Sequence, residues 1–197
     1  MSHGKFAGIV LLSTALISTV LAYQHGVIAC IPVEFSKTAE TYPGYPVFAV
    51  GIMVAGASMF HYHLAKDLSS SAYIGLVASF LMSFIGIVNG GTDTIRIIHS
   101  VITLSSFLLY GIYSYQRGAN KWFVLAAGVV LVIRYLHLAS LVNWKGVFEN
   151  PWNIKEFIKE AVLTPRIGVV QFRGLCQWTV IALLGYMVLS LCHEKLY

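Results

Sequence analysis

The chain has 197 residues, of which 57% are apolar or aromatic and only 11% are charged. A soluble domain usually carries about 25% charged residues, so this composition excludes an ordinary soluble enzyme and a disordered tail. The net charge is +5, because 13 Lys and Arg residues outnumber 8 Asp and Glu residues. The basic residues are scattered along the chain, which argues against nucleic acid as a partner. The cysteines lack CxxC spacing, which excludes a disulfide framework and a structural zinc site.

Six stretches are long and apolar enough to cross a membrane, because a helix needs roughly 20 apolar residues to span a hydrocarbon core. They contain many small residues, which allow helix backbones to approach closely. The predicted spans cover about residues 6–23, 47–65, 72–88, 95–115, 122–142 and 174–192. We therefore predict an all-α polytopic membrane protein, with a single six-helix transmembrane domain over residues 1–197 and a short interfacial helix in the last loop.

The first span could also be a secretory signal peptide. Its apolar run is longer than the 7–15 residues of a signal sequence, and LAYQHG is a poor cleavage site. We therefore expect a retained helix. Lys and Arg residues occur on both sides of the predicted membrane in similar numbers, so the positive-inside rule leaves the orientation open.

Two long connections, 25–46 and 143–172, are expected on the same side of the membrane. In the second, NPWNIKEFIKEAVL predicts a short helix with Asn150 as its N-cap and Pro151 at its first position. Its apolar positions fall on one face and its charged positions on the other. Such a helix either lies in the membrane interface or packs over the mouth of the bundle. The apolar positions are Ile154, Phe157, Ile158, Ala161 and Val162.

Ionisable side chains inside membrane spans are costly and therefore mark candidate sites. Alternating helix directions place His99, Arg134 and His137 toward the side of the long connections, together with Asp93 and Arg96. We treat these five residues as a candidate polar cluster. The alternative is that Arg134 and His137 extend to the interface or bond to neighbouring helices and loop carbonyls.

Two alternatives assign chemistry to these side chains. Two histidines at matched depth on neighbouring helices suit a bis-histidine haem; His99 with His137 is one such pair, and His63 with His193 is another. The second alternative is a hydrolase with a His/Asp metal site, or with Asp93 and His99 as acid and base. No HExxH or GxSxG motif supports the hydrolase.

Cys30 and Cys176 are expected on the same side of the membrane, which makes them candidates for a disulfide in an oxidising compartment. The alternative is that Cys176 is a small buried apolar side chain.

Three stretches together resemble a known family. They are IPVEFSKTAETYPGYPVFAVGIMVAGASMFHYH, ASFLMSFIGIVNGGTDTIRIIHSVITLSSFLLYGIYSYQ, and NWKGVFENPWN followed by FRGLCQWTVIALLGYMVLSL. They are similar to the first loop, the third and fourth helices, and the last loop and helix of the DRAM-type superfamily of six-span proteins. This superfamily includes the damage-regulated autophagy modulators, their plasma-membrane relatives and the Golgi proteins that remodel GPI-anchor lipids. His99 corresponds to the His that opens the family's fourth helix, whereas Gln177 stands where the family has a carboxylate.

The resemblance implies cytosolic N- and C-termini, with both long connections lumenal or extracellular. It implies an integral membrane protein of the lysosome, the Golgi or the plasma membrane, and it carries over no catalytic residue. We therefore expect a non-enzymatic adaptor or lipid-handling subunit, in autophagy or GPI-lipid biology, that binds a lipid headgroup near His99, Arg134 and His137. We expect no cofactor other than a bound lipid, and we expect membrane lipids and other membrane proteins as partners. The alternatives are a lipid-remodelling enzyme, a haem electron carrier and an accessory subunit of a large membrane complex.

Overall fold

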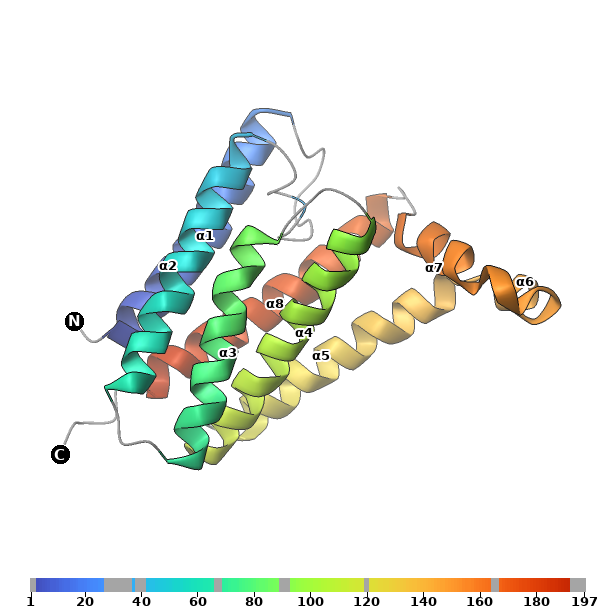
Figure 1. Ribbon diagram of the computed structural model, residues 1–197. Coiled ribbons are helices and arrows are strands. Elements are labelled where there is room, and N and C mark those ends of the chain that lie inside the picture. Colours follow the sequence, from blue (N-terminus) through green and yellow to red (C-terminus); the bar gives the residue numbers. More distant parts are fainter. Residues whose placement is uncertain are drawn as a thin grey trace.

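The computed structural model describes residues 3–26, 37, 42–65, 69–88, 93–118, 121–163 and 167–191. All regular secondary structure in these ranges is helical (Figure 1). The long helices are α1 (His3–Gln24), α2 (Gly44–Leu64), α3 (Ser70–Ile87), α4 (Asp93–Gln116), α5 (Lys121–Leu141) and α8 (Ile167–Leu191). The short ones are α6 (Trp144–Glu149), the 3-10 turn η2 (Pro151–Asn153) and α7 (Ile154–Leu163).

Each of the six predicted spans coincides with a long helix, and the all-α fold is confirmed. Four of these helices, α1, α2, α3 and α5, are long and apolar enough to cross a membrane. The helix that contains the last predicted span, α8, begins at Ile167, seven residues before the predicted start of that span at about Gly174. Arg173 therefore lies inside the helix, and it is only 6% exposed.

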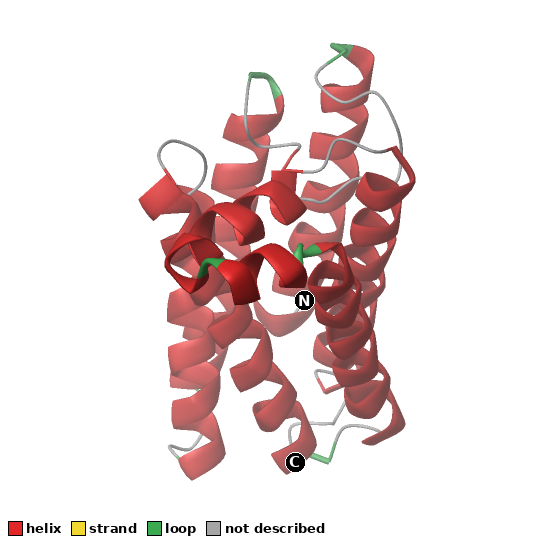
Figure 2. Cartoon of the chain, turned by 90° about the vertical axis from the view of Figure 1, so that its right-hand side faces the viewer, coloured by secondary structure: helices red, strands yellow, loops and turns green. Residues whose placement is uncertain are grey.

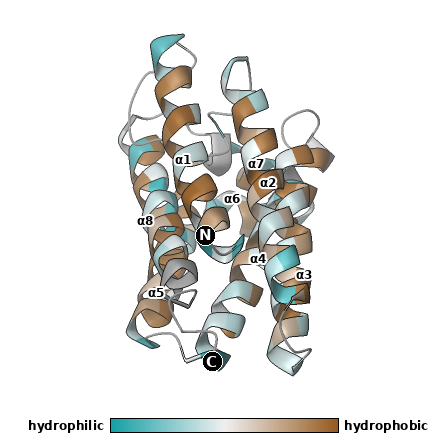
Figure 3. Ribbon diagram, turned by 90° about the vertical axis from the view of Figure 1, so that its left-hand side faces the viewer, coloured by the Kyte–Doolittle hydropathy of each residue, from teal (hydrophilic) through white to brown (hydrophobic). Residues whose placement is uncertain are grey.

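Five helices form a closed ring in which α1 packs on α2, α2 on α3, α3 on α4, α4 on α8, and α8 on α1. Helix α5 lies outside the ring and packs mainly against α8. Much of α1 and α2 consists of hydrophobic residues (Figure 3). Helices α4 and α8 begin at the same end of the bundle, which we call the upper end, as it appears in Figure 1.

Small polar side chains join α3 to α4 inside the ring. The Ser106 hydroxyl of α4 donates to the Ala78 carbonyl of α3 over 3.0 Å. The hydroxyls of Ser79 and Tyr110 form a second bond between these helices, at 2.6 Å. Both serines are fully buried. Such bonds allow serines to lie within an apolar bundle, because a buried hydroxyl without a partner would be costly.

The segment after α5 forms an arm, consisting of α6, η2 and α7, that extends away from the bundle (Figures 1 and 2). The Asn143 side chain caps α6 by accepting from the Gly146 N–H over 3.1 Å. Asn150 occupies the N-cap position of η2, but its side chain makes no capping bond, so this detail of the prediction was wrong. The backbone N–H of Asn150 instead closes the last turn of α6 on the Gly146 carbonyl.

The predicted apolar face of α7 is divided between the arm's own core and its surface. Phe157 packs with Val142 and Val147, whereas Ile154 and Ile158 are each 42% exposed. Among the described helices of the bundle, α7 contacts α5. The described part of the arm therefore lies beside the bundle.

Candidate functional site

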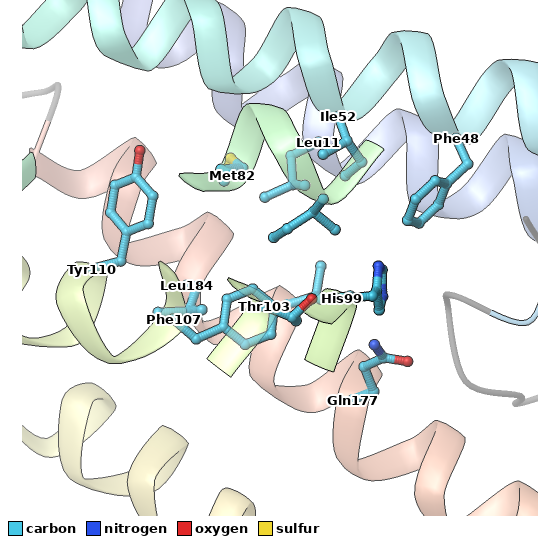
Figure 4. A pocket seen from close by; sticks show the side chains of 12 residues that line it. Leu11, Phe48, Ile52, Met82, His99, Thr103, Phe107, Tyr110, Gln177 and Leu184 are labelled. Atoms are coloured by element: carbon cyan, nitrogen blue, oxygen red, sulfur yellow. The ribbon is translucent and has the colours of Figure 1, made fainter. Parts of the chain in front are cut away.

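The ring encloses a cavity of about 40 Å³. Its walls are mostly apolar and come from all five ring helices; they include Leu11, Phe48, Ile52, Met82, Ile85 and Ile181. The polar side chains that line it are His99, Thr103 and Tyr110 of α4 and Gln177 of α8. Figure 4 shows His99, Thr103 and Gln177 close together, with Tyr110 at the other end of the cavity. We call His99, Thr103 and Gln177 the cavity trio.

His99 lies in the second turn of α4, and its Nδ1 hydrogen-bonds to the carbonyl oxygen of Val88, just after α3. Because a carbonyl can only accept, Nδ1 must carry the proton. In the neutral ring this leaves Nε2 as an acceptor. The bond therefore fixes both the orientation and the tautomer of the ring that lines the cavity.

Thr103 and Gln177 complete the cavity trio from two different helices. Thr103 follows His99 by four residues and therefore lies on the same face of α4. Its Oγ1 is buried and has no hydrogen-bond partner among the described residues. Gln177 is only 7% exposed. Together with Ile181 and Leu184 it forms the stripe of α8 that lines the cavity.

Arg173 precedes Gln177 by one turn on α8. The spacing of four residues places it on the same face of the helix, toward the upper end. It is only 6% exposed. The last predicted span began at about Gly174, so Arg173 lay outside it and was not included in the candidate cluster.

Two of the predicted cluster residues lie elsewhere, between α5 and α8. The His137 ring of α5 packs against the Phe172 ring of α8, tilted by 49° and with ring centroids 4.4 Å apart. Arg134 precedes His137 by three residues and therefore lies on the same face of α5. The structure therefore brings Arg134 and His137 together on one side of α8, while His99 lies on the side that carries Gln177.

Asp93 and Arg96 belong to the first turn of α4, and their side chains lie outside the described part of the chain. Cys176 is described and is a buried free thiol. Its candidate disulfide partner, Cys30, lies outside the described residues.

The described residues do not bring His99 and His137 together on one haem, and they do not test the pair of His63 and His193. His99 and His137 line different sides of α8, so their rings cannot hold one haem between them. The cavity of about 40 Å³ is also far smaller than a porphyrin. The His63 ring packs edge-on against Tyr113 with centroids 4.6 Å apart, and His193 lies outside the described residues. Within the described ranges, no group of three or more His, Cys, Asp or Glu side chains is arranged to hold a metal ion.

Sequence reasoning missed Thr103 and the role of Gln177. A usable signal was present, because Thr103 lies at position i+4 from His99 on one helix face. Gln177 was noted only as a departure from the resembling family. An uncharged amide at a buried position of a membrane helix indicates hydrogen bonding inside the bundle.

The chain matches no protein-family model, no curated protein and no solved structure. The interpretation of the site therefore depends on its own geometry.

Proposed function

We propose that this chain is a six-span integral membrane protein that binds the polar end of a membrane lipid in the ring cavity. It acts as a non-enzymatic lipid-handling or adaptor subunit, as the resemblance to the DRAM-type superfamily implies. One observation carries the proposal: the cavity trio lines a mostly apolar cavity, and the buried Thr103 hydroxyl has no hydrogen-bond partner among the described residues.

The chemistry of the cavity trio favours an uncharged polar group. A buried hydroxyl without a partner costs about 1–3 kcal/mol, and a ligand that bonds to it recovers that cost. His99 offers an acceptor, Thr103 a donor and an acceptor, and Gln177 an amide. Among the residues that the structure describes, no acidic side chain lines the cavity. A lipid hydroxyl or ester suits this set, whereas a positively charged headgroup would find no counter-charge in the cavity lining.

Helix length and the placement of polar groups support the proposal that α4 and α8 also cross the membrane. Helices α4 and α8 have 24 and 25 residues, and about 20 residues suffice to cross a hydrocarbon core of about 30 Å. Their buried polar side chains, which include Ser106 and Gln177, lie inside the ring rather than toward lipid. We propose that the location is the lysosome, the Golgi or the plasma membrane, with cytosolic termini.

The test is binding of a defined lipid to the full chain in mild detergent, measured by native mass spectrometry. Dioleoylglycerol, which offers a hydroxyl and two esters, is the probe. Thr103→Val and Gln177→Leu each remove one hydrogen-bonding group, so we expect each to weaken binding about five- to tenfold.

The matched control is Thr179→Val. Its hydroxyl bonds within α8 to the Leu175 carbonyl over 2.9 Å, and it does not line the cavity. We expect no change in binding for this variant. Equal binding by all three variants and the unaltered chain would overturn the proposal, and so would the absence of any bound dioleoylglycerol.

The same protein tests the enzyme alternative through His99. Vesicles containing phosphatidylcholine and a glycosylphosphatidylinositol are incubated with the unaltered chain and with His99→Ala, and the lipids are then analysed. The proposal expects the lipids to stay chemically unchanged with both proteins. A product formed by the unaltered chain and lost in His99→Ala would favour a lipid-remodelling enzyme instead.

A further inference from the structure

A second open space, an apolar groove of about 200 Å³, lies between α4, α5 and α8. It is lined from α4 by residues that include Gly111 and Ile112, from α5 by Val124 and Gly128, and from α8 by Val180. Every side chain in its lining is apolar. The groove lies nearer the lower end than the cavity trio, because α4 runs downward from His99 to Gly111.

The groove and the ring cavity are neighbours. Phe107 of α4 and Leu184 of α8 line both spaces. These two side chains therefore stand between the groove and the cavity. They lie where α4 meets α8, and this is the most sparsely packed contact in the ring. A flexible chain can pass from one space to the other by displacing two apolar side chains, without separating tightly packed helices.

We infer that the groove holds one hydrocarbon chain of the lipid whose polar end binds the cavity trio. The inference deepens the proposed function and rests on it. The occupant is an acyl chain because the lining offers no polar atom of a side chain and because two of the three helices that form the groove, α4 and α8, also bear the cavity trio. A peptide or a headgroup would bury unsatisfied polar groups there.

The dimensions agree with one acyl chain. The twelve residues from His99 to Gly111 correspond to about 18 Å along α4, at 1.5 Å per residue. One leaflet of a hydrocarbon core is about 15 Å thick. A lipid with its polar end at His99 therefore reaches into the groove as far as Leu108, which lies about 14 Å from His99 along α4 and lines the groove.

Glycines keep the groove open. A Cβ added to Gly111 or to Gly128 would meet no described atom within 4 Å. Larger side chains at these two positions would project into the groove without clashing with the backbone of a neighbouring helix. Gly111→Leu and Gly128→Leu therefore fill the groove and leave the bundle folded.

The first experiment is photo-crosslinking with a dioleoylglycerol analogue that carries a diazirine near the end of one acyl chain. We expect the unaltered full chain, in mild detergent, to be labelled on α4 and α5 at the groove. In Gly111→Leu and Gly128→Leu, the new side chain takes the place of two or three methylenes of the lipid chain in the groove. The lipid loses the free energy of burying them, so labelling at the groove should fall by tenfold or more.

The matched control is Gly168→Leu, which adds the same side chain at an exposed position of α8 that also has no atom within 4 Å and lies outside the groove. It should be labelled as strongly as the unaltered chain. Thermal unfolding of all three variants checks that they remain folded, and the map of labelled residues in the unaltered chain needs no variant.

The outcomes separate this inference from the proposed function. We call the binding of a hydrocarbon chain in the groove the acyl route. If binding of the analogue depends on Thr103 but the analogue labels residues outside the groove, the acyl route is wrong, and the proposal that the cavity binds the polar end of the lipid stands. If both leucine variants in the groove are labelled like Gly168→Leu, the acyl route is also wrong. If the unaltered chain binds no analogue, the proposed function fails and the acyl route fails with it.

Discussion

In α2 and α3, glycines lie where two helices touch, whereas in α4 and α5 they line open space. A Cβ at Gly86 would lie 2.6 Å from the Ala49 carbonyl oxygen, and a Cβ at Gly75 would lie 2.5 Å from the His63 ring. A Cβ at Gly111 or Gly128 would meet no described atom within 4 Å. Glycine therefore allows close helix packing in the half of the molecule that contains α2 and α3, and it lines open space in the half that contains α4 and α5.

The difference shows which part of the bundle is a scaffold. Close backbone approach is the main source of helix association in membranes, where the hydrophobic effect does not drive packing. Helices α1, α2 and α3 pack closely along most of their lengths, whereas α4, α5 and α8 meet more sparsely. The ring cavity and the groove both border the sparse half. Ligand exchange is thus expected there, because fewer contacts must break.

The largest expected effect on the free energy of unfolding comes from replacing one glycine with alanine in each half of the bundle. In Gly86→Ala the new Cβ meets the backbone of α2, which cannot rotate away, so the free energy of unfolding should fall by about 1–3 kcal/mol. Gly111→Ala should raise it by up to about 1 kcal/mol, because alanine favours the helix. Thermal unfolding in detergent, followed by circular dichroism, measures both. Equal losses in the two variants would contradict the contrast between the two halves.

Two hydroxyls on α4, three residues apart, sharpen the comparison. Ser106 is fully buried and bonds to α3, so Ser106→Ala should cost about 1 kcal/mol of unfolding free energy. The Thr103 hydroxyl has no partner among the described residues, so Thr103→Val in lipid-free detergent should raise the free energy of unfolding by about 1 kcal/mol or more, because it removes the cost of a buried hydroxyl without a partner. Chemical denaturation measures both. A large loss for Thr103→Val without lipid would mean that this hydroxyl holds the fold together.

Helix positions could be predicted from the sequence because hydrophobicity along a chain is a local property. The same is true of the position along the bundle, since alternating helix directions place His99, Arg134 and His137 toward the same end of the bundle. Rotation about a helix axis is different, because it depends on which helices become neighbours. The structure turns His99 into the ring and His137 toward Phe172, so residues at similar depth line separate spaces.

The arm shows a second limit of sequence reasoning. The helix α6 was not predicted, because WKGVFE is short and contains a glycine. It forms since Asn143 caps its first turn and since Phe157 packs over Gly146. The second contact comes from α7, across the 3-10 turn, and a local pattern does not reveal it. The short helix predicted from residue 150 onward is present as η2 and α7.

The contact between α8 and α1 joins the two halves and gives the smallest expected effect. A Cβ at Gly185 would lie 3.1 Å from Leu12 Cδ2, which is the end of a flexible side chain and can move. Gly185→Ala should therefore change the free energy of unfolding by less than about 1 kcal/mol, because the gain in helix propensity offsets the small shift of Leu12. Thermal unfolding beside Gly86→Ala measures it. If the two variants lose equal stability, α8 belongs to the rigid scaffold, and a lipid chain would have to enter by displacing α4 or α5 instead.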